Sequence, residues 1–233
     1  MGCGLAPAAS ALAAPPWWLD WALLPKAHET VVRLQYVSNQ TNTTRTDSLP
    51  QYQLFYGVTP NFDLSVRSDD IETSSPSNRG YGDTLFCAKW RFYRNHAGVQ
   101  LLAGHFATLP TANSGLGGRA AAQQPFLVAA KQIGHWSVAA QLAETFPGNK
   151  ALQNSTSYGL LAACKSTKRW QFGGDIYGNT PTASGANQEF GAGLGIQYCS
   201  SPELRYCFHV AHSFEGFNKV NLFCGVQVNL PAH

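Results

Sequence analysis

Seven histidines and six cysteines are the side chains best suited to metal binding or nucleophilic chemistry in this chain. The histidines form no H-x-x-x-H or H-E-x-x-H pattern, and the cysteines form no C-x-x-C pair; these are spacings that gather metal ligands. His209 and His212 would point to opposite faces of a straight strand, so they cannot bind one ion together. The sequence therefore predicts no metal site and no other cofactor.

The serine, histidine and cysteine side chains are also poorly placed for catalysis. A nucleophile needs a base within reach on the same face, but His212 and Ser213 are adjacent, on opposite faces, and lack a Ser-x-Gly or similar elbow. Cys199 and Cys207 share a hairpin but are two residues out of register, too far for disulfide geometry. We therefore expect no enzymatic activity, and free thiols that pack as small apolar groups.

The composition excludes several classes of protein. Charged residues make up 12% of the 233 residues, against about 25% in an average soluble domain. The formal net charge of +3 is too small and too scattered for a nucleic-acid partner. The apolar content of 44% is too high for a disordered chain, and no uninterrupted apolar stretch is long enough for a spanning helix. A β architecture remains.

The elements that carry these residues show a period of two. In Phe62–Arg67, Phe86–Phe92 and Phe190–Tyr198 the even positions are apolar or small, and the odd positions are polar or small with few exceptions. Because alternate side chains of a strand point to opposite faces, each segment is a strand with one apolar and one polar face. Twelve such segments are predicted, at approximately 29–38, 50–58, 62–70, 83–94, 98–110, 123–132, 135–146, 156–165, 168–178, 187–199, 204–214 and 218–230.

The connections between these segments alternate in length. Short turns, such as 59–61 and 200–203, alternate with long connections rich in Asn, Ser, Thr, Gly and Pro, except for the short last one. The long connections are 39–49, 71–82, 111–122, 147–155 and 179–186. This plan is typical of outer-membrane barrels. The predicted fold is therefore an all-β, 12-stranded antiparallel transmembrane barrel of the bacterial outer membrane, with short periplasmic turns, long extracellular loops and both termini periplasmic.

The apolar even face is expected to meet lipid, and the polar odd face to line a lumen. Even-phase aromatic side chains gather near the short turns, where a membrane-interface girdle should lie. Segments 98–110 and 123–132 alternate weakly, and there His105 fits the lumen better than lipid. The side chains expected to line the solute pathway are Arg33, Asp63, Arg67, Lys89, Arg91, Lys131, Lys165, Asp175, Glu189, Arg205 and His209.

The charges on the odd face suggest how the lumen works. The odd face carries seven cations and four acids, Asp69 among the acids. This excess of positive charge predicts a mild preference for anions. Gln53 is expected opposite Arg67, with Lys89 on the next strand, so one wall is long and basic. The segments between 135 and 199 present Ala and Gly, so the other wall is small and flat. One hypothesis is an off-centre channel along the small wall; the other is that the charges pair and close the barrel.

The amino-terminal part differs from the rest of the chain. Residues 1–27 are Ala-rich and carry an A-x-A pattern at Ala11–Ala13, of the kind that signal peptidase reads, but no basic residue precedes Lys26. A truncated signal peptide is the favoured interpretation, and an Ala-rich tail is the alternative. Residues 28–233 are expected to form a single barrel domain.

Several hairpins together resemble one family. Tyr56–Leu64, Gly80–Asp83 followed by a strand with Lys89, and Ala107–Thr111 followed by the Gly-rich Gly115–Gly118 occur in the order found in the outer-membrane family named after the meta-pathway of phenol degradation. These elements cover residues 52 to 118, about a third of the chain. The resemblance implies a monomeric outer-membrane barrel thought to move aromatic or other poorly soluble compounds.

Three functions remain open at this point. The first is a channel or transporter for small solutes, aromatic ones among them; the second is a structural or closed outer-membrane barrel; the third is a soluble lipid-binding barrel. For the first two the expected partners are outer-membrane lipid and the barrel-assembly machinery, and the first adds a small-molecule solute. The assembly signal at the carboxyl end is represented by Gly225, Val228 and Leu230, although it lacks the usual terminal aromatic residue.

Overall fold

The computed structural model describes residues 24–41, 44–74, 77–113, 116–117, 120–150, 152–181, 188–215 and 218–231. Within these residues no helix is long and apolar enough to cross a membrane. Residues 1–23, which hold most of the expected leader, lie outside the described part, so the signal peptide and the boundary at residue 28 stay predictions. Leu24 and Pro25, placed by the sequence in the leader, are buried.

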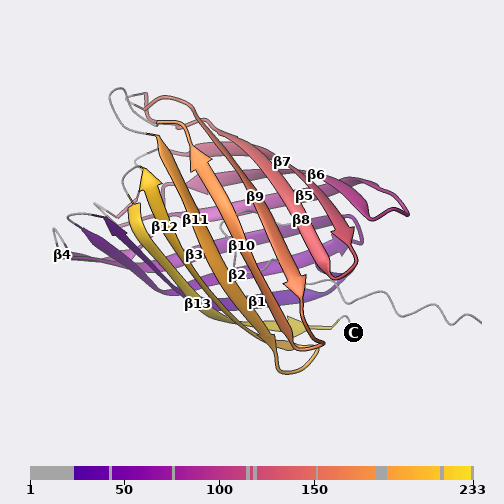
Figure 1. Ribbon diagram of the computed structural model, residues 1–233. Coiled ribbons are helices and arrows are strands. Elements are labelled where there is room, and N and C mark those ends of the chain that lie inside the picture. The colour runs from indigo at the N-terminus through magenta and orange to yellow at the C-terminus, as the bar shows by residue number, and fades with distance from the viewer. Residues whose placement is uncertain are drawn as a thin grey trace, which may run out of the picture.

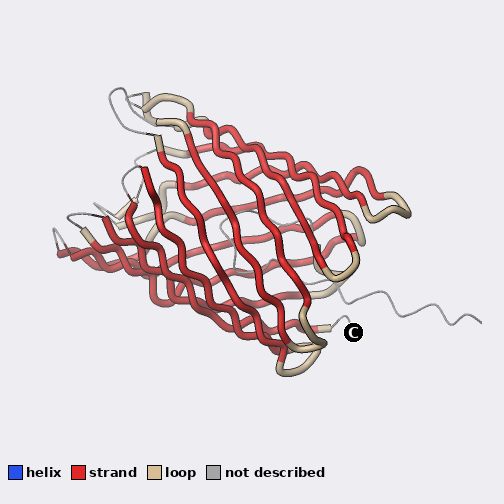
Figure 2. Tube along the Cα trace, viewed as in Figure 1, coloured by secondary structure: helices blue, strands red, loops and turns tan. Residues whose placement is uncertain are grey.

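The described chain is built from β-strands (Figures 1 and 2), as its period of two predicts. Their bounds are β1 Thr30–Thr41, β2 Arg45–Thr59, β3 Phe62–Ser74, β4 Ser77–Tyr81, β5 Thr84–Arg94, β6 Val99–Leu109, β7 Ala122–Ile133, β8 Trp136–Thr145, β9 Ser155–Lys165, β10 Trp170–Asn179, β11 Glu189–Cys199, β12 Leu204–Glu215 and β13 Asn218–Leu230.

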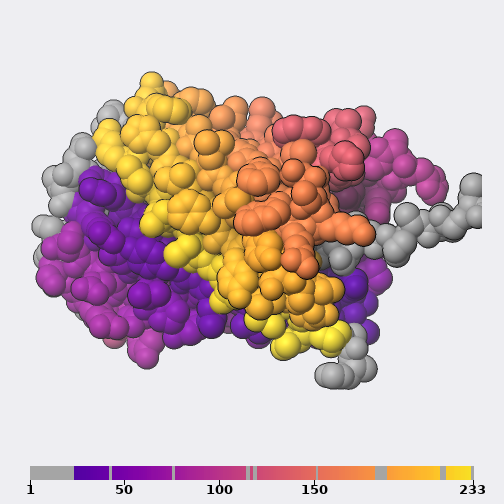
Figure 3. All heavy atoms as spheres, turned by 60° about the horizontal axis from the view of Figure 1, so that its bottom comes forward, coloured from indigo at the N-terminus to yellow at the C-terminus, as the bar shows by residue number. Residues whose placement is uncertain are grey.

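Twelve of these strands close into an antiparallel barrel. Each pairs with its neighbours along the chain, and β1 also pairs with β13, which joins the two ends of the sheet. In Figure 3 the yellow carboxyl-terminal strands accordingly lie against the indigo first strands. The remaining strand, β4, pairs only with the outer part of β3. The structure thus confirms the predicted 12-stranded barrel and adds one short strand.

Two of the predicted long loops are wrong. Residues 39–49 mostly continue β1 and β2, and residues 71–82 continue β3 and form β4, so these connections are extended hairpins. The sequence failed to show this because alternation marks a strand only where one face must be apolar. Beyond the apolar band of a barrel both faces can be polar, and pairing continues without a hydrophobic pattern.

The wall is apolar outside and polar inside. Large apolar side chains that are exposed on the outer surface include Leu34, Trp90, Leu160, Leu194 and Phe208. Glutamine, asparagine and charged side chains are buried on the inner surface instead. A soluble barrel would show the reverse distribution. The structure therefore confirms the apolar-out assignment that the sequence suggested.

The assignment of even positions to the outside is wrong for β6 and β7. In these strands Leu102, Phe126 and Val128 are buried inside, whereas His105 and Lys131 are exposed. The phase changes at β5, where the register with β6 shifts between Arg91 and Tyr93, and it returns after the short turn into β8. A single bulge residue inverts every following side chain, and weak alternation in these segments hid it.

Candidate functional site

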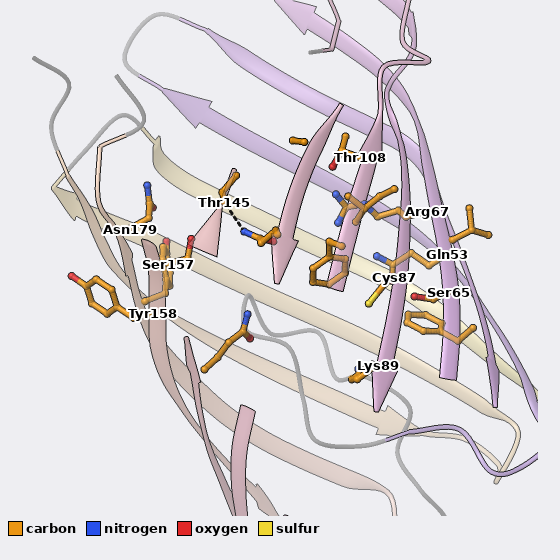
Figure 4. Close-up of a pocket in the computed structure, with 18 of the residues that line it drawn as sticks. Gln53, Ser65, Arg67, Cys87, Lys89, Thr108, Thr145, Ser157, Tyr158 and Asn179 are labelled. Carbon is orange, nitrogen blue, oxygen red and sulfur yellow. Dashed lines mark hydrogen bonds between the residues drawn. The ribbon is translucent and has the colours of Figure 1, made fainter. Parts of the chain in front are cut away.

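The barrel interior holds a cavity of about 570 Å³. Figure 4 shows Gln53, Arg67 and Lys89 extending from strands on one side, with Thr145 and Ser157 on the opposite side. Most of the lining side chains are polar, and they come from both walls of the barrel. Since β-strands fix each side chain to one face, the closed sheet holds these groups around a common space.

The charge in this cavity is mainly positive. Arg33, Arg67 and Lys89 line it from β1, β3 and β5, whereas Glu189 of β11 is the acidic residue among the lining side chains that the structure describes. Arg67 is the most accessible of the three cations, with a side chain that is 41% exposed. Cations in a low-dielectric tube raise the local concentration of anions.

Arg33 is held in place by its neighbours. Its guanidinium donates to Gln53 Oε1 at 3.2 Å and to Gln227 Oε1 at 2.8 Å, from the two strands that flank β1. It also lies 5.4 Å from the centre of the Phe55 ring, a cation–π contact. The two glutamines are neutral, so they fix the guanidinium without cancelling its charge.

A buried acid–base pair lies on the wall formed by β10 to β12. Nε2 of His209 is 3.0 Å from Oδ1 of Asp175, and both side chains are inaccessible. Gly193, on the strand between them, makes this contact possible, because a Cβ there would lie 2.3 Å from His209 Nε2 and 2.5 Å from Asp175 Oδ1. Both predicted residues therefore face inward, but they form a packed pair below the cavity surface.

A second polar network connects the cavity to this wall. The Ser213 hydroxyl donates to Glu189 Oε1 at 2.9 Å and lies 3.3 Å from the Tyr177 hydroxyl, which accepts from Asn221 Nδ2 at 3.3 Å. Glu189 therefore faces inward as predicted. The hydrogen bond from Ser213 holds its carboxylate in place without cancelling the charge, so Glu189 remains a counter-charge to the basic wall.

The half of the barrel near the short turns is densely filled. Asp63 and Lys89 are buried and face one another across β3 and β5, and Arg205 is buried on β12. Leu24 belongs to an apolar cluster inside the barrel, together with Leu102. The cavity accordingly opens on the half of the barrel that carries the long connections.

Seven of the predicted lumen residues do not line the cavity: Asp63, Asp175, Arg205 and His209 are buried on the inner side of the wall, and three others lie elsewhere. Lys131 is exposed on the outer face of β7, opposite in phase to buried Ala130, so its assignment to the lumen is wrong because of the phase change described above. Lys165 is exposed at the very end of β9. Arg91 bonds Asn61 Oδ1 at 3.1 Å and Gln100 Oε1 at 3.0 Å, which ties it to a turn.

The small wall does not form an open path. Ala139 and Ala163, which the sequence placed along a channel, pack in the apolar cluster with Phe126 and Leu161. A Cβ on Gly191 would lie 2.7 Å from the Tyr177 ring. The small residues therefore make room for large side chains inside the barrel, and the cavity lies nearer the basic wall.

Sequence reasoning missed several inward side chains. Gln197 and Gln227 are almost fully buried, and Glu29 is buried just before β1. The glutamines share the odd phase of the predicted charges, so the same pattern could have identified them. Glu29 opens the predicted segment 29–38 in the same odd phase, whereas Leu24 precedes all of the alternating segments and no periodicity marks it.

The remaining candidates for chemistry behave as follows. Cys87, Cys164, Cys199, Cys207 and Cys224 are free thiols. Cys199 pairs in register with Arg205, and Cys207 with Gln197, which confirms the predicted two-residue offset. His212 is exposed whereas Ser213 is buried, so the two lie on opposite faces. Among the described residues no three metal-ligating side chains gather.

Comparison with known proteins identifies the type of barrel. No protein-family model and no curated protein sequence matches the chain. An outer membrane channel from Pseudomonas putida F1 is similar in structure, with a TM-score of 0.74 and 14% identity over 97% of this chain and 100% of that one. The KdgM porin gives 0.64 and 12%, covering 85% and 99%, and the NanC porin gives 0.65 and 7%, covering 85% and 100%. The fold is therefore that of outer-membrane channels and porins.

Proposed function

We propose that this protein is an outer-membrane channel through which small solutes pass, with a preference for anions. The observation that carries the proposal is the polar cavity inside the closed barrel, where Arg33, Arg67 and Lys89 outnumber Glu189. The apolar outer surface supports insertion into a bilayer rather than a role as a soluble lipid carrier. In this proposal residues 28–233 are the barrel domain, folded as a monomer by the barrel-assembly machinery.

The resemblance of residues 52 to 118 to the phenol-degradation family supports a finer proposal about the solute. Aromatic compounds would find both apolar and polar surface in the cavity, since Phe55 and Phe106 line it beside the cations. Liposome swelling with small aromatic solutes tests this point. Swelling no faster than with sugars of the same size would remove the aromatic preference and leave the channel.

The channel itself is tested by reconstitution. The full chain, inserted in planar bilayers under a KCl gradient, should give discrete conductance steps and a reversal potential of the sign set by chloride. The Arg67→Gln variant should move that potential toward zero, while Lys131→Gln, the same charge change on the outer face, should not. A cation-selective wild type would overturn the proposed preference.

A closed structural barrel is the second candidate, and the filled half near the short turns favours it. The two candidates differ in one measurement. A barrel that inserts, migrates in a heat-modifiable way on SDS gels and yet never conducts would be a structural barrel.

A further inference from the structure

The inner surface carries a row of alternating arginines and glutamines, of which the sequence predicts only that Gln53 lies opposite Arg67. Arg67 of β3 pairs in register with Gln53 of β2, Gln53 with Arg33 of β1, Arg33 with Gln227 of β13, and Gln227 with Arg205 of β12. These five residues come from opposite ends of the chain, and closure of the barrel brings them into one continuous row. We call this row the arginine ladder.

The ladder climbs through the barrel. Counted from the short-turn end of its strand, Arg205 lies one residue from Leu204, Arg33 three residues from Thr30, and Arg67 five residues from Phe62. Because the residues of the row are in-register partners, successive arginines lie two strand spacings apart, about 10 Å across the sheet, and the tilt of the strands places each one higher in the barrel than the last. The cations form evenly spaced steps from the short-turn mouth to the cavity.

The glutamines separate the arginines of the ladder from one another. Arg33 donates to the amide oxygens on both sides of it, to Gln53 at 3.2 Å and to Gln227 at 2.8 Å. Gln227 also donates to Asn229 Oδ1 at 2.9 Å, so its amide is oriented by a further partner. Each guanidinium is thus separated from the next by a neutral, hydrogen-bonded amide, and the five residues of the row include no carboxylate.

The lower step has unused hydrogen-bonding capacity. Arg205 is 3% exposed, and its Nε and Nη1 atoms have no hydrogen-bond partner among the described residues. Buried guanidinium N–H groups without a partner are costly, and an oxyanion would satisfy them with charge-assisted bonds. Arg67, at the upper step, points into the cavity and has Asp69 as its acidic neighbour at 3.9 Å, beyond hydrogen-bond distance.

We propose that the arginine ladder is a row of oxyanion sites. A solute bearing a carboxylate, sulfonate or phosphate binds at Arg67 in the cavity, passes to Arg33, and reaches buried Arg205 when the packed side chains of the short-turn half move aside. This inference rests on the proposed channel and names the group that it recognises. A guanidinium binds such an oxyanion with two parallel N–H donors, which an ammonium cannot do. The path runs along the basic wall rather than along the wall of small residues.

The exit of the ladder is bordered by an acid. Oε1 of Glu29 accepts from Asn229 Nδ2 at 3.1 Å, and Oε2 accepts from the Lys26 amide at 2.8 Å. An anion that has reached Arg205 therefore meets a carboxylate at the short-turn mouth. Repulsion at that point favours release, as conduction through a row of sites requires that binding at the last one be weak.

The test uses the full chain in planar bilayers, with benzoate as the probe and neutral benzamide as its isostere. Benzoate should block the chloride current in a concentration-dependent way, and benzamide should not. Arg67→Gln, Arg33→Gln and Arg205→Gln should each weaken the benzoate block by about tenfold, the loss of one charge-assisted bond. Arg45→Gln and Arg79→Gln, which change exposed arginines outside the ladder, are the matched controls and should leave the block unchanged.

A lysine separates guanidinium recognition from charge alone. Arg33→Lys should keep the anion selectivity but lose most of the benzoate block. If Arg33→Gln fails to fold, Arg67→Gln still decides, because the Arg67 side chain is 41% exposed and its ion pair with Asp69 is long, at 3.9 Å. A conducting wild type whose ladder variants match the two controls would overturn the ladder and leave the channel standing. A wild type without conductance would overturn the proposed function itself.

Discussion

Placing a charge on the outer wall tests the orientation of the barrel most directly. Leu194 is the central residue of β11, five residues from either end, and 71% of its surface is exposed. Five residues span about 17 Å of strand, and a tilt of about 40° leaves about 13 Å along the membrane normal. That is half of an apolar band about 25 Å tall, so Leu194 lies close to the bilayer midplane.

Replacing Leu194 by arginine should therefore destabilise the barrel strongly. An arginine at the midplane of a transmembrane barrel costs about 2–4 kcal/mol, and near the interface the cost falls to about 0–1 kcal/mol. The matched control is Leu109→Arg, because Leu109 is also exposed and outward but ends its strand. The assay is reversible denaturant unfolding of the barrel in lipid vesicles, followed by tryptophan fluorescence.

The test compares how much each of the two variants lowers the free energy of unfolding. We expect Leu194→Arg to lower the free energy of unfolding by at least about 2 kcal/mol more than Leu109→Arg. If both variants cost the same small amount, the outer wall does not contact hydrocarbon at Leu194. The reasoning that places the apolar face against lipid would then be wrong.

Three further predictions concern the inner and outer faces of the wall. Cys87 lines the cavity, so its thiol samples the potential there. In a variant with Cys87 as its single cysteine, the ratio of the labelling rates with anionic and cationic methanethiosulfonates should exceed the same ratio for free cysteine. Equal ratios would contradict a positive lumen. Gly193→Ala should destabilise the barrel by about 2 kcal/mol, because its Cβ displaces His209 from Asp175; unchanged unfolding would show that the pair contributes nothing. Lys131→Gln should leave the reversal potential unchanged, and a shift as large as that of Arg67→Gln would place Lys131 in the lumen.

The strong alternation of most segments was sufficient to predict their strands. In β3, β5, β8, β11 and β13 a side-chain period of two is forced by the need for one apolar face, so the strands, their faces and their order are local properties of the sequence. The opposition of Gln53 and Arg67 was predictable for the same reason, since a tight turn fixes the register of its hairpin.

The sequence could not predict the structure at positions where the alternation of apolar and polar residues gives no information. The outward position of Lys131 depends on the register shift in β5, a feature of pairing that leaves no mark on residue types. The continuation of β1 through the expected loop depends on pairing between polar segments. The burial of Leu24 depends on the barrel that surrounds it.

The sequence by itself determined that this chain is a barrel with an apolar outside and a polar, mainly cationic inside, because alternation and turn length are encoded residue by residue. Only the tertiary structure decided where those cations stand relative to one another. Arg205 and Gln227 lie far along the chain from Arg33 and Arg67, and they join one row because the last strand pairs with the first. Register across that closing seam is a property of the whole sheet, and it turns scattered charges into an ordered ladder.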